Sequence, residues 1–246
     1  MTRDLGDAAV TTVPGSQPDL ATLAALQERF RTGIGEVAPD VPVPWCGRWR
    51  VRHLVVHLAR IHHWAAGQAR RRQETPLGRG PFVLDDLYAA QAAELHETLA
   101  ALDPDAPAWT LDDSGVVRFW HRRQVHETLV HLWDLRTAGD LPLEVAPALW
   151  ADTVDEVVRV MHPRQVRLGR STASPVRVGL AATDAGRTWT VHARDDAPAA
   201  PVAEVAGPAA SLALLLWGRT TLDDPHLAAT GDRAALQAAL GGPLTP

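Results

Sequence analysis

Four long segments in the first two thirds of the chain carry apolar residues at helical spacing, and this pattern constrains the fold most. The apolar positions recur every three to four residues, which is typical of a helix with one buried face. Segments rich in proline or glycine separate these stretches, so consecutive helices turn back on one another. The pattern predicts an up-and-down, antiparallel helical bundle. The expected helices span about residues 20–34, 51–72, 84–102 and 117–138.

The pattern changes after a fifth expected helix, Pro147 to Met161, which begins with proline at the favoured first-turn position. Short stretches then alternate between apolar and polar residues, which indicates strands joined by turns. The expected elements are strands at 176–180, 188–193 and 201–206 and helices at 208–217 and 232–240. We therefore predict an all-α part followed by a small α+β domain. The predicted divisions are a flexible arm (1–17), the bundle (18–164) and the α+β domain (165–246).

The absence of lysine excludes several kinds of enzyme. All 24 residues counted as Lys and Arg are arginine. A chain without lysine forms no lysine Schiff base and has no P-loop lysine. The net charge of −5 argues against a dedicated nucleic-acid binder. The heavy use of Ala, Arg, Gly and Pro is typical of a GC-rich genome, such as that of an actinobacterium.

Targeting signals and disulfides are also not expected. No apolar run has the length of a signal peptide or of a membrane span, and the single cysteine, Cys46, has no intramolecular partner. We expect a cytoplasmic protein, monomeric or homodimeric, with small-molecule partners and no membrane partner.

Glu127 and His131 form the strongest local motif. Because positions i and i+4 lie on one face of a helix, this carboxylate and this imidazole can converge on a single ion. Zinc enzymes commonly use three protein ligands and leave a fourth position open. His57 supplies the third candidate, because an ionisable ring in the apolar run Leu-Val-Val-His-Leu-Ala needs a buried partner. The three residues predict a divalent-metal site between neighbouring helices, and zinc is the preferred ion.

The same residues allow other interpretations. A Glu-x-x-x-His pair is often only a solvated pair on a helix, and a lone histidine on an apolar face is often a hydrogen-bonded core residue. His53, one turn before His57, is interpreted as a surface residue or an outer partner of the site. Asp134, one turn after His131, is interpreted first as a surface acid, with a hydrogen bond to a ligand imidazole as the alternative. Three other histidines are not expected to be ligands: His62, His63 and His126.

Other side chains have weaker signals. Cys46 is interpreted as structural rather than nucleophilic, because no recognisable pattern pairs it with a histidine. The pair Arg122–Arg123 and the run Arg70–Arg72 are expected on solvated faces. Arg219 follows an apolar segment where the small domain meets the bundle. Its guanidinium there either clamps a substrate carboxylate through two hydrogen bonds or forms a structural salt bridge.

Three segments together resemble the mycothiol-dependent maleylpyruvate isomerase family. They are WCGRWRVRHLVVHLARIHHW (Trp45–Trp64), FWHRRQVHETLVHLWD (Phe119–Asp134) and the C-terminal VRVGLAATDAGRTWTV…VAGPAASLALLLWGR…LAATGD. The resemblance covers nearly the whole chain beyond about residue 19. It implies a DinB-like, metal-binding four-helix bundle followed by a sterol-carrier-like α+β domain. It also implies that His57, Glu127 and His131 are the metal ligands and that Arg219 helps to hold the substrate. The chain departs from the family at His53, where an acid is usual, and after Cys46, where Gly-Arg replaces a common Pro-Gly.

The resemblance implies thiol chemistry. We expect the metal to activate the sulfur of mycothiol, a thiol cosubstrate, for attack on an electrophilic small molecule. A maleylpyruvate-like compound and a natural-product intermediate both fit, and the outcome is either isomerisation or S-transfer. Two alternatives remain: a metal-dependent hydrolase or lyase that uses metal-bound water, and a non-catalytic small-molecule-binding protein.

Overall fold

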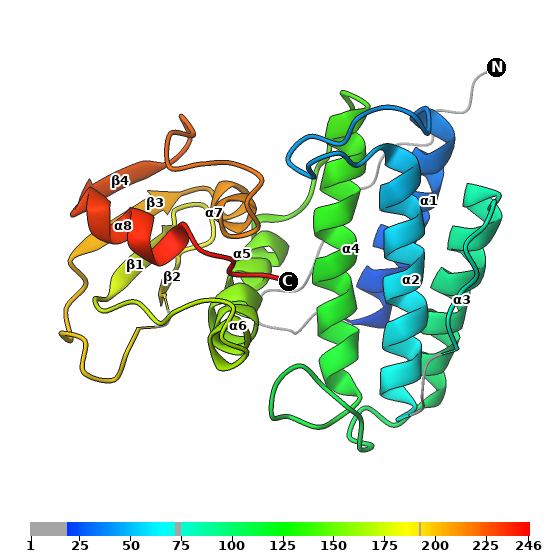
Figure 1. Cartoon of the computed structure of the whole chain (residues 1–246), viewed down its shortest axis with the longest axis horizontal. Helices are drawn as coiled ribbons and strands as arrows, with labels where there is room; N and C mark the ends of the chain where they lie inside the picture. Colours follow the sequence, from blue (N-terminus) through cyan, green and yellow to red (C-terminus); the bar gives the residue numbers. More distant parts are fainter. Residues whose placement is uncertain (1–18, 72–74, 192) are drawn as a thin grey trace.

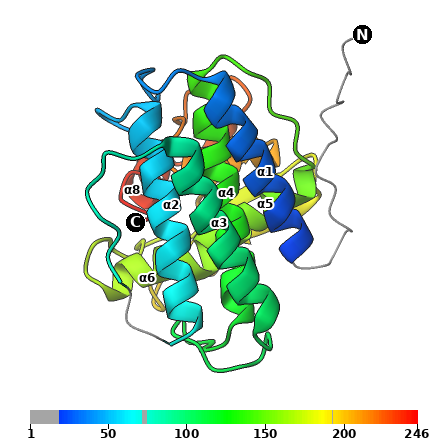
Figure 2. The same cartoon turned by 90° about the vertical axis from the view of Figure 1, so that its right-hand side faces the viewer.

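The computed structural model describes residues 19–71, 75–191 and 193–246. Among these residues, four long helices lie side by side in one half of the molecule (Figure 1, Figure 2). The helices are α1 (Leu20–Glu36), α2 (Val51–Ala69), α3 (Leu84–Ala101) and α4 (Arg118–Ala138). Both α1 and α2 pack against α3 and α4. The helix positions expected from the apolar spacing are confirmed to within three residues. The predicted arm, 1–17, lies outside the described residues.

Helix α4 is the central element of the molecule. It lies between α1 and α2 on one side and the C-terminal part of the chain on the other (Figure 1). As a result, 14 of its 21 residues are buried, including polar and charged ones. Buried polar side chains need partners, because water cannot reach them. The charged face of α4 is therefore the place where an organised polar site is built.

The helical region after α4 is irregular. Helix α5 (Pro147–Glu156) runs into a π-helical turn, η1 (Val157–Met161), and then into α6 (His162–Arg167). The expected start at Pro147 is confirmed, but the helical chain continues past the expected end at Met161. Pro163 has no N–H to donate to the carbonyl of Arg159, and its ring crowds that carbonyl. The turn is accordingly wider there, with the amide of His162 donating to the carbonyl of Val157.

A sheet forms the rest of the described C-terminal part. Its strands are β1 (Val178–Ala182), β2 (Arg187–Thr190), β3 (Ala203–Gly207) and β4 (Ala228–Gly231), in the order β2-β1-β3-β4. The β1–β3 pair is parallel and the other two pairs are antiparallel. Helices α7 (Ala209–Leu216) and α8 (Arg233–Leu240) pack against strands β1 and β3. The mixture of helix and sheet predicted from the sequence is confirmed, as are three strands, but β4 was not anticipated.

The two parts of the chain meet at α5. This helix packs mainly on α7 and more lightly on α4, so it joins the sheet-containing part to the central helix. The division of the chain near residue 165 stays a prediction. Of the helices in the described part of the chain, none combines the length and apolar character that a membrane crossing requires.

His62 is a buried histidine in the core between α2 and α4. Its side chain has no exposed surface, and its Nδ1 lies 2.9 Å from Oε1 of Gln124. Burial disfavours the charged ring and lowers the pKa of His62 from 6.5 to about 4. His62 is therefore neutral in the folded protein at neutral pH.

This histidine predicts a loss of stability in mild acid. Between pH 6.5 and pH 4 the unfolded chain protonates His62 while the folded protein does not, so the free energy of unfolding falls as the pH falls. The full effect is about 3 kcal/mol. The free energy of unfolding, measured by chemical denaturation between pH 7.5 and pH 4.5, should fall more steeply for the parent than for His62→Gln. Parallel declines for the two proteins would contradict this account.

Candidate metal centre

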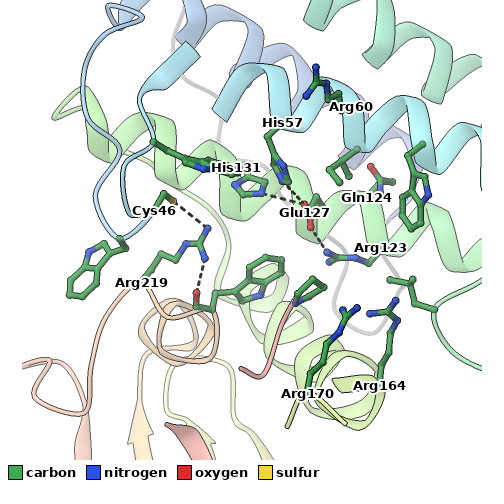
Figure 3. Close-up of a pocket in the computed structure, with 17 residues that line it drawn as sticks. Cys46, His57, Arg60, Arg123, Gln124, Glu127, His131, Arg164, Arg170 and Arg219 are labelled. Carbon is green, nitrogen blue, oxygen red and sulfur yellow. Dashed lines mark hydrogen bonds and ion pairs between the residues drawn. The ribbon is translucent and has the colours of Figure 1, made fainter. Parts of the chain in front are cut away.

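Three side chains from α2 and α4 point toward one another on the side of these helices that faces the cavity (Figure 3). His57 lies in the middle of α2, and Glu127 and His131 lie one turn apart on α4. Nε2 of His57 is 3.5 Å from Oε1 of Glu127, and Nε2 of His131 is 3.3 Å from the same oxygen. The rings of His57 and His131 are nearly perpendicular, with centroids 4.9 Å apart. Both nitrogens thus face one carboxylate oxygen.

The spacing of these donor atoms fits a divalent ion. All three atoms lie within 4.8 Å of one another, and no other such group of His, Cys, Asp or Glu occurs within 19–71, 75–191 and 193–246. Bonds of about 2.0–2.2 Å to a tetrahedral zinc ion separate neighbouring ligand atoms by roughly 3.3–3.5 Å. The two measured separations match this value. The structure therefore brings together the three residues selected by sequence, and the identity of the ion stays a prediction.

Asp134 orients one of the two imidazoles. Its Oδ2 accepts a hydrogen bond of 2.9 Å from Nδ1 of His131, which leaves Nε2 of that ring directed at Glu127. Asp134 has no exposed surface, so its interpretation as a surface acid is wrong. Burial opposes the charge on His131, but the bonds to Asp134 and Glu127 outweigh it and raise the pKa of His131 to about 9. A carboxylate that fixes a ligand histidine in this way is common around protein metal sites.

Arg123 holds the other oxygen of the central carboxylate. One turn before Glu127 on α4, its Nη2 donates to Oε2 of Glu127, and its Nη1 donates to Oε2 of Glu156 on α5 at 2.8 Å. All three side chains are almost fully buried. Arg123, and with it His131 and His57, keep the pKa of Glu127 well below its usual range despite burial. The expectation that Arg122–Arg123 lies on a solvated face is wrong, because Arg122 is likewise paired, with Asp152.

The three candidate ligands open onto a cavity of about 680 Å³. Tryptophan rings form much of its apolar wall: Trp45, Trp49, Trp64 and Trp217. Five arginines also line it, whereas Glu127 is its single acidic side chain. The size is typical of a small-molecule site, and the charge is strongly positive.

Arg219 and Cys46 form one end of this cavity (Figure 3). The guanidinium of Arg219 donates to Asp134 through Nε at 3.1 Å and Nη2 at 2.8 Å, and Nη1 donates to the carbonyl of Trp217. Sγ of Cys46 lies 3.6 Å from Nη2 of Arg219 and 3.7 Å from Oδ2 of Asp134. Burial and Asp134 outweigh Arg219 and raise the pKa of the Cys46 thiol to about 11.

The remaining histidines near the motif are engaged elsewhere. Nδ1 of His63 pairs with Glu94, and His126 bonds Thr153 and Asp152. His53 is exposed, and its Nδ1 accepts a hydrogen bond from the amide of Arg50 at the start of α2. None of these rings belongs to the group of three donors.

Sequence models of two protein domains match this chain. The model described as the mycothiol maleylpyruvate isomerase N-terminal domain matches residues 20–136, and the model described as the MDMPI C-terminal domain matches residues 148–238. The chain belongs to the mycothiol-dependent maleylpyruvate isomerase family. The resemblance carried by the three sequence segments is thus confirmed.

Solved structures share the fold of this family member. A crystal structure of the mycothiol-dependent maleylpyruvate isomerase matches with a TM-score of 0.60 and 14% identity, over 87% of this chain and 92% of that chain. A histidine-to-alanine mutant of that isomerase matches with a TM-score of 0.57 at the same identity and coverage. A comparison with curated protein sequences gave no match.

Sequence reasoning missed four charged residues around the site of this family member: Arg123, Glu156, Arg164 and Arg170. The i,i+4 spacing of Arg123 and Glu127 is the one local signal that was available, since it is typical of an ion pair on a helix. The other three lie on α5, on α6 and just after α6. Glu156 contacts Arg123, and Arg164 and Arg170 line the cavity, only because of the tertiary fold.

Proposed function

We propose that this chain is a zinc-dependent enzyme that uses mycothiol as a cosubstrate, acting as an isomerase or as an S-transferase on an electrophilic small molecule. The observation that carries the proposal is the convergence of His57, Glu127 and His131 on one wall of a small-molecule cavity, in a member of this family. The structural neighbour described as a mycothiol-dependent maleylpyruvate isomerase supports the same chemistry.

The chain's own residues prepare the metal site. His57 and His131 would hold the ion through Nε2 and Glu127 through Oε1, since Asp134 binds Nδ1 of His131 and Arg123 binds Oε2 of Glu127. A zinc ion bound there favours the thiolate form of a coordinating thiol at neutral pH.

The nucleophile is the cosubstrate thiol and not the protein's cysteine. The pKa of Cys46, about 11, leaves its sulfur protonated at neutral pH, and a protonated thiol is a poor nucleophile. Cys46 instead borders the cavity beside Arg219. The role of Arg219 as a catalytic residue that touches the substrate stays a prediction.

The proposed reaction begins with attack of the mycothiol thiolate on an unsaturated carbon, which forms a C–S bond, breaks the π bond and moves its electron pair onto the conjugated electron-withdrawing group of the substrate. In an isomerase, the former double bond rotates as a single bond, and expulsion of the thiolate breaks the C–S bond and restores the double bond. In an S-transferase, the adduct takes up a proton or loses a leaving group, and the C–S bond remains. No oxidant or reductant is required in either course.

Calorimetric titration of mycothiol into the full chain, zinc-loaded and metal-free, tests this proposal. We expect binding to the zinc-loaded protein and at least about 100-fold weaker binding to the metal-free protein. Equal binding to both forms, or binding to neither, would contradict it. Turnover of an ester or other water-labile substrate without added thiol would favour a metal-dependent hydrolase or lyase, and bound lipid without metal would favour a binding protein.

We further propose that α1 to α4 form a DinB-like antiparallel four-helix bundle within residues 18–164 and that residues 165–246 form a sterol-carrier-like α+β domain. The mutual packing of the four helices and the sheet order β2-β1-β3-β4 support this division. The packing of α5 on α7 links the two parts. We propose that the protein acts in the cytoplasm as a monomer or homodimer.

A further inference from the structure

Two of the five arginines that line the cavity have neither an ion pair nor a hydrogen bond for the guanidinium group in the described part of the chain. Arg123 pairs with Glu127 and Glu156, and Arg219 pairs with Asp134. Arg60 has no ion pair, but its Nη2 donates to the carbonyl of Gly78 at 3.2 Å. In contrast, the guanidinium groups of Arg164 and Arg170 have no ion pair and no hydrogen bond to any residue in the described part of the chain. They are cations facing a cavity whose single acidic side chain is already engaged, and neither forms an ion pair with the carboxylate of Pro246, the last residue, which also lines the cavity.

The surroundings of Arg164 make its charge costly in the protein alone. The side chain is partly buried on α6, and Arg170, Arg167 and Arg123 are its charged neighbours. Burial, together with these like charges, lowers the pKa of Arg164. In the described residues no ion pair offsets the cost of this charge, and the planar guanidinium matches the two-oxygen geometry of a carboxylate.

The position of the pair is set by the fold. Figure 3 shows Arg164 and Arg170 rising from the α6 side of the cavity toward the wall that carries Glu127 and His57. The candidate metal ligands come from α2 and α4, whereas this pair comes from the end of the helical region that follows α5. A molecule that spans the cavity therefore meets the metal site at one end and two unpaired cations at the other.

We propose that Arg164 and Arg170 bind a carboxylate of the electrophilic substrate, on the cavity wall opposite His57, Glu127 and His131. The inference rests on the proposed function and deepens it, because it names the side chains that hold a carboxylate remote from the carbon that the thiol attacks. It also separates this role from Arg219, whose Nε and Nη2 already donate to Asp134.

The test uses inert probes of graded charge on the zinc-loaded full chain. Succinate, monomethyl succinate and dimethyl succinate have nearly the same backbone and carry two, one and no negative charges at neutral pH. We expect succinate to bind at least about 10-fold more tightly than the dimethyl ester, by calorimetry or tryptophan fluorescence. We expect Arg164→Gln and Arg170→Gln to weaken succinate binding about 10-fold each and about 100-fold together.

Matched controls separate this site from the metal and from net charge. Arg71→Gln removes an arginine that is exposed at the end of α2 and does not line the cavity, so it should leave succinate binding unchanged. The double variant Arg164→Gln/Arg170→Gln should keep the parent's affinity for mycothiol and should unfold at the parent's temperature or above it. Succinate binding that is equally tight in the double variant, or an ester that binds as tightly as succinate, would overturn the proposal. If the parent does not bind mycothiol but binds succinate in a way that depends on the two arginines, the proposed thiol function is rejected and the carboxylate site is retained.

Discussion

Zinc affinity is expected to fall by more than about 100-fold in the His57→Ala variant. Loss of an outer partner of a metal ligand typically costs 10–100-fold, so loss of a ligand should reach at least the upper end of that range. His57 is the best ligand to remove, because its side chain is 31% exposed and its one close polar contact among the described residues is with Glu127. The expected loss is therefore one of metal binding and not of folding. Mycothiol binding should disappear with the zinc.

The matched control is His53→Ala. His53 lies one turn earlier on α2, is exposed, and accepts a hydrogen bond from the amide of Arg50. Its removal costs a helix-terminal hydrogen bond, about 1 kcal/mol, and should leave zinc affinity unchanged. Competition with a chromophoric chelator measures zinc affinity in both variants, and thermal unfolding of the metal-free proteins verifies folding. Parent-like zinc affinity in His57→Ala, or equal losses in the two variants, would remove His57 from the site.

The contrast between His53 and His57 illustrates what local pattern predicts well. Both rings lie on the same helix, yet His57 was favoured because it interrupts an apolar run, and the structure directs it at Glu127. The pair Glu127 and His131 can be predicted for a similar reason, since i,i+4 spacing places both residues on the same face of any helix. Helix periodicity and i,i+4 spacing are local properties, so the sequence alone predicts the helices and the pair Glu127 and His131. That His57 meets this pair depends on the packing of α2 on α4, which the family resemblance implied.

The surroundings of the trio depend on tertiary packing instead. Asp134, Arg122 and Arg123 were interpreted as surface residues because charged side chains on a helix usually face water. In this protein α4 is covered on both sides, so its charged face is internal (Figure 1). Nothing in the helical period distinguishes a face covered by a second domain from a face in water.

Two local features were missed for other physical reasons. Strand β4 consists of small residues that are exposed throughout, so it lacks the alternation that identifies a half-buried strand. It forms because its backbone pairs with β3. The π-helical turn before Pro163 also left no periodic trace, because the proline changes the hydrogen bonding of a helix whose apolar pattern is intact.

Arg123→Met is expected to lower the free energy of unfolding of the metal-free protein by about 3–5 kcal/mol. Arg123 is buried between Glu127 and Glu156, whose side chains are 7% and 2% exposed. Removing the cation leaves Glu156 without its cationic partner and leaves Glu127 with His131 and His57 alone, and leaving a buried charge unpaired is the costly half of breaking a buried ion pair. For a chain of this size, the melting temperature should fall by roughly 6–20 °C.

An exposed arginine of the same helix provides the control. Arg118 pairs with Asp105 at the surface, where both side chains are more than half exposed, so Arg118→Met should cost less than about 1 kcal/mol. If the deficit of Arg123→Met comes from the unpaired carboxylates, adding Glu156→Gln should recover part of it, and saturating zinc should recover another part by neutralising Glu127. Two outcomes would show that Arg123 does not hold Glu127 in place by charge. The first is a free energy of unfolding of Arg123→Met within about 1 kcal/mol of the parent. The second is a further loss of stability, and no recovery, when Glu156→Gln is added to Arg123→Met. Recovery of stability by zinc would mean that two cations balance the charge of the Glu127 carboxylate: Arg123 on α4 and the bound zinc ion.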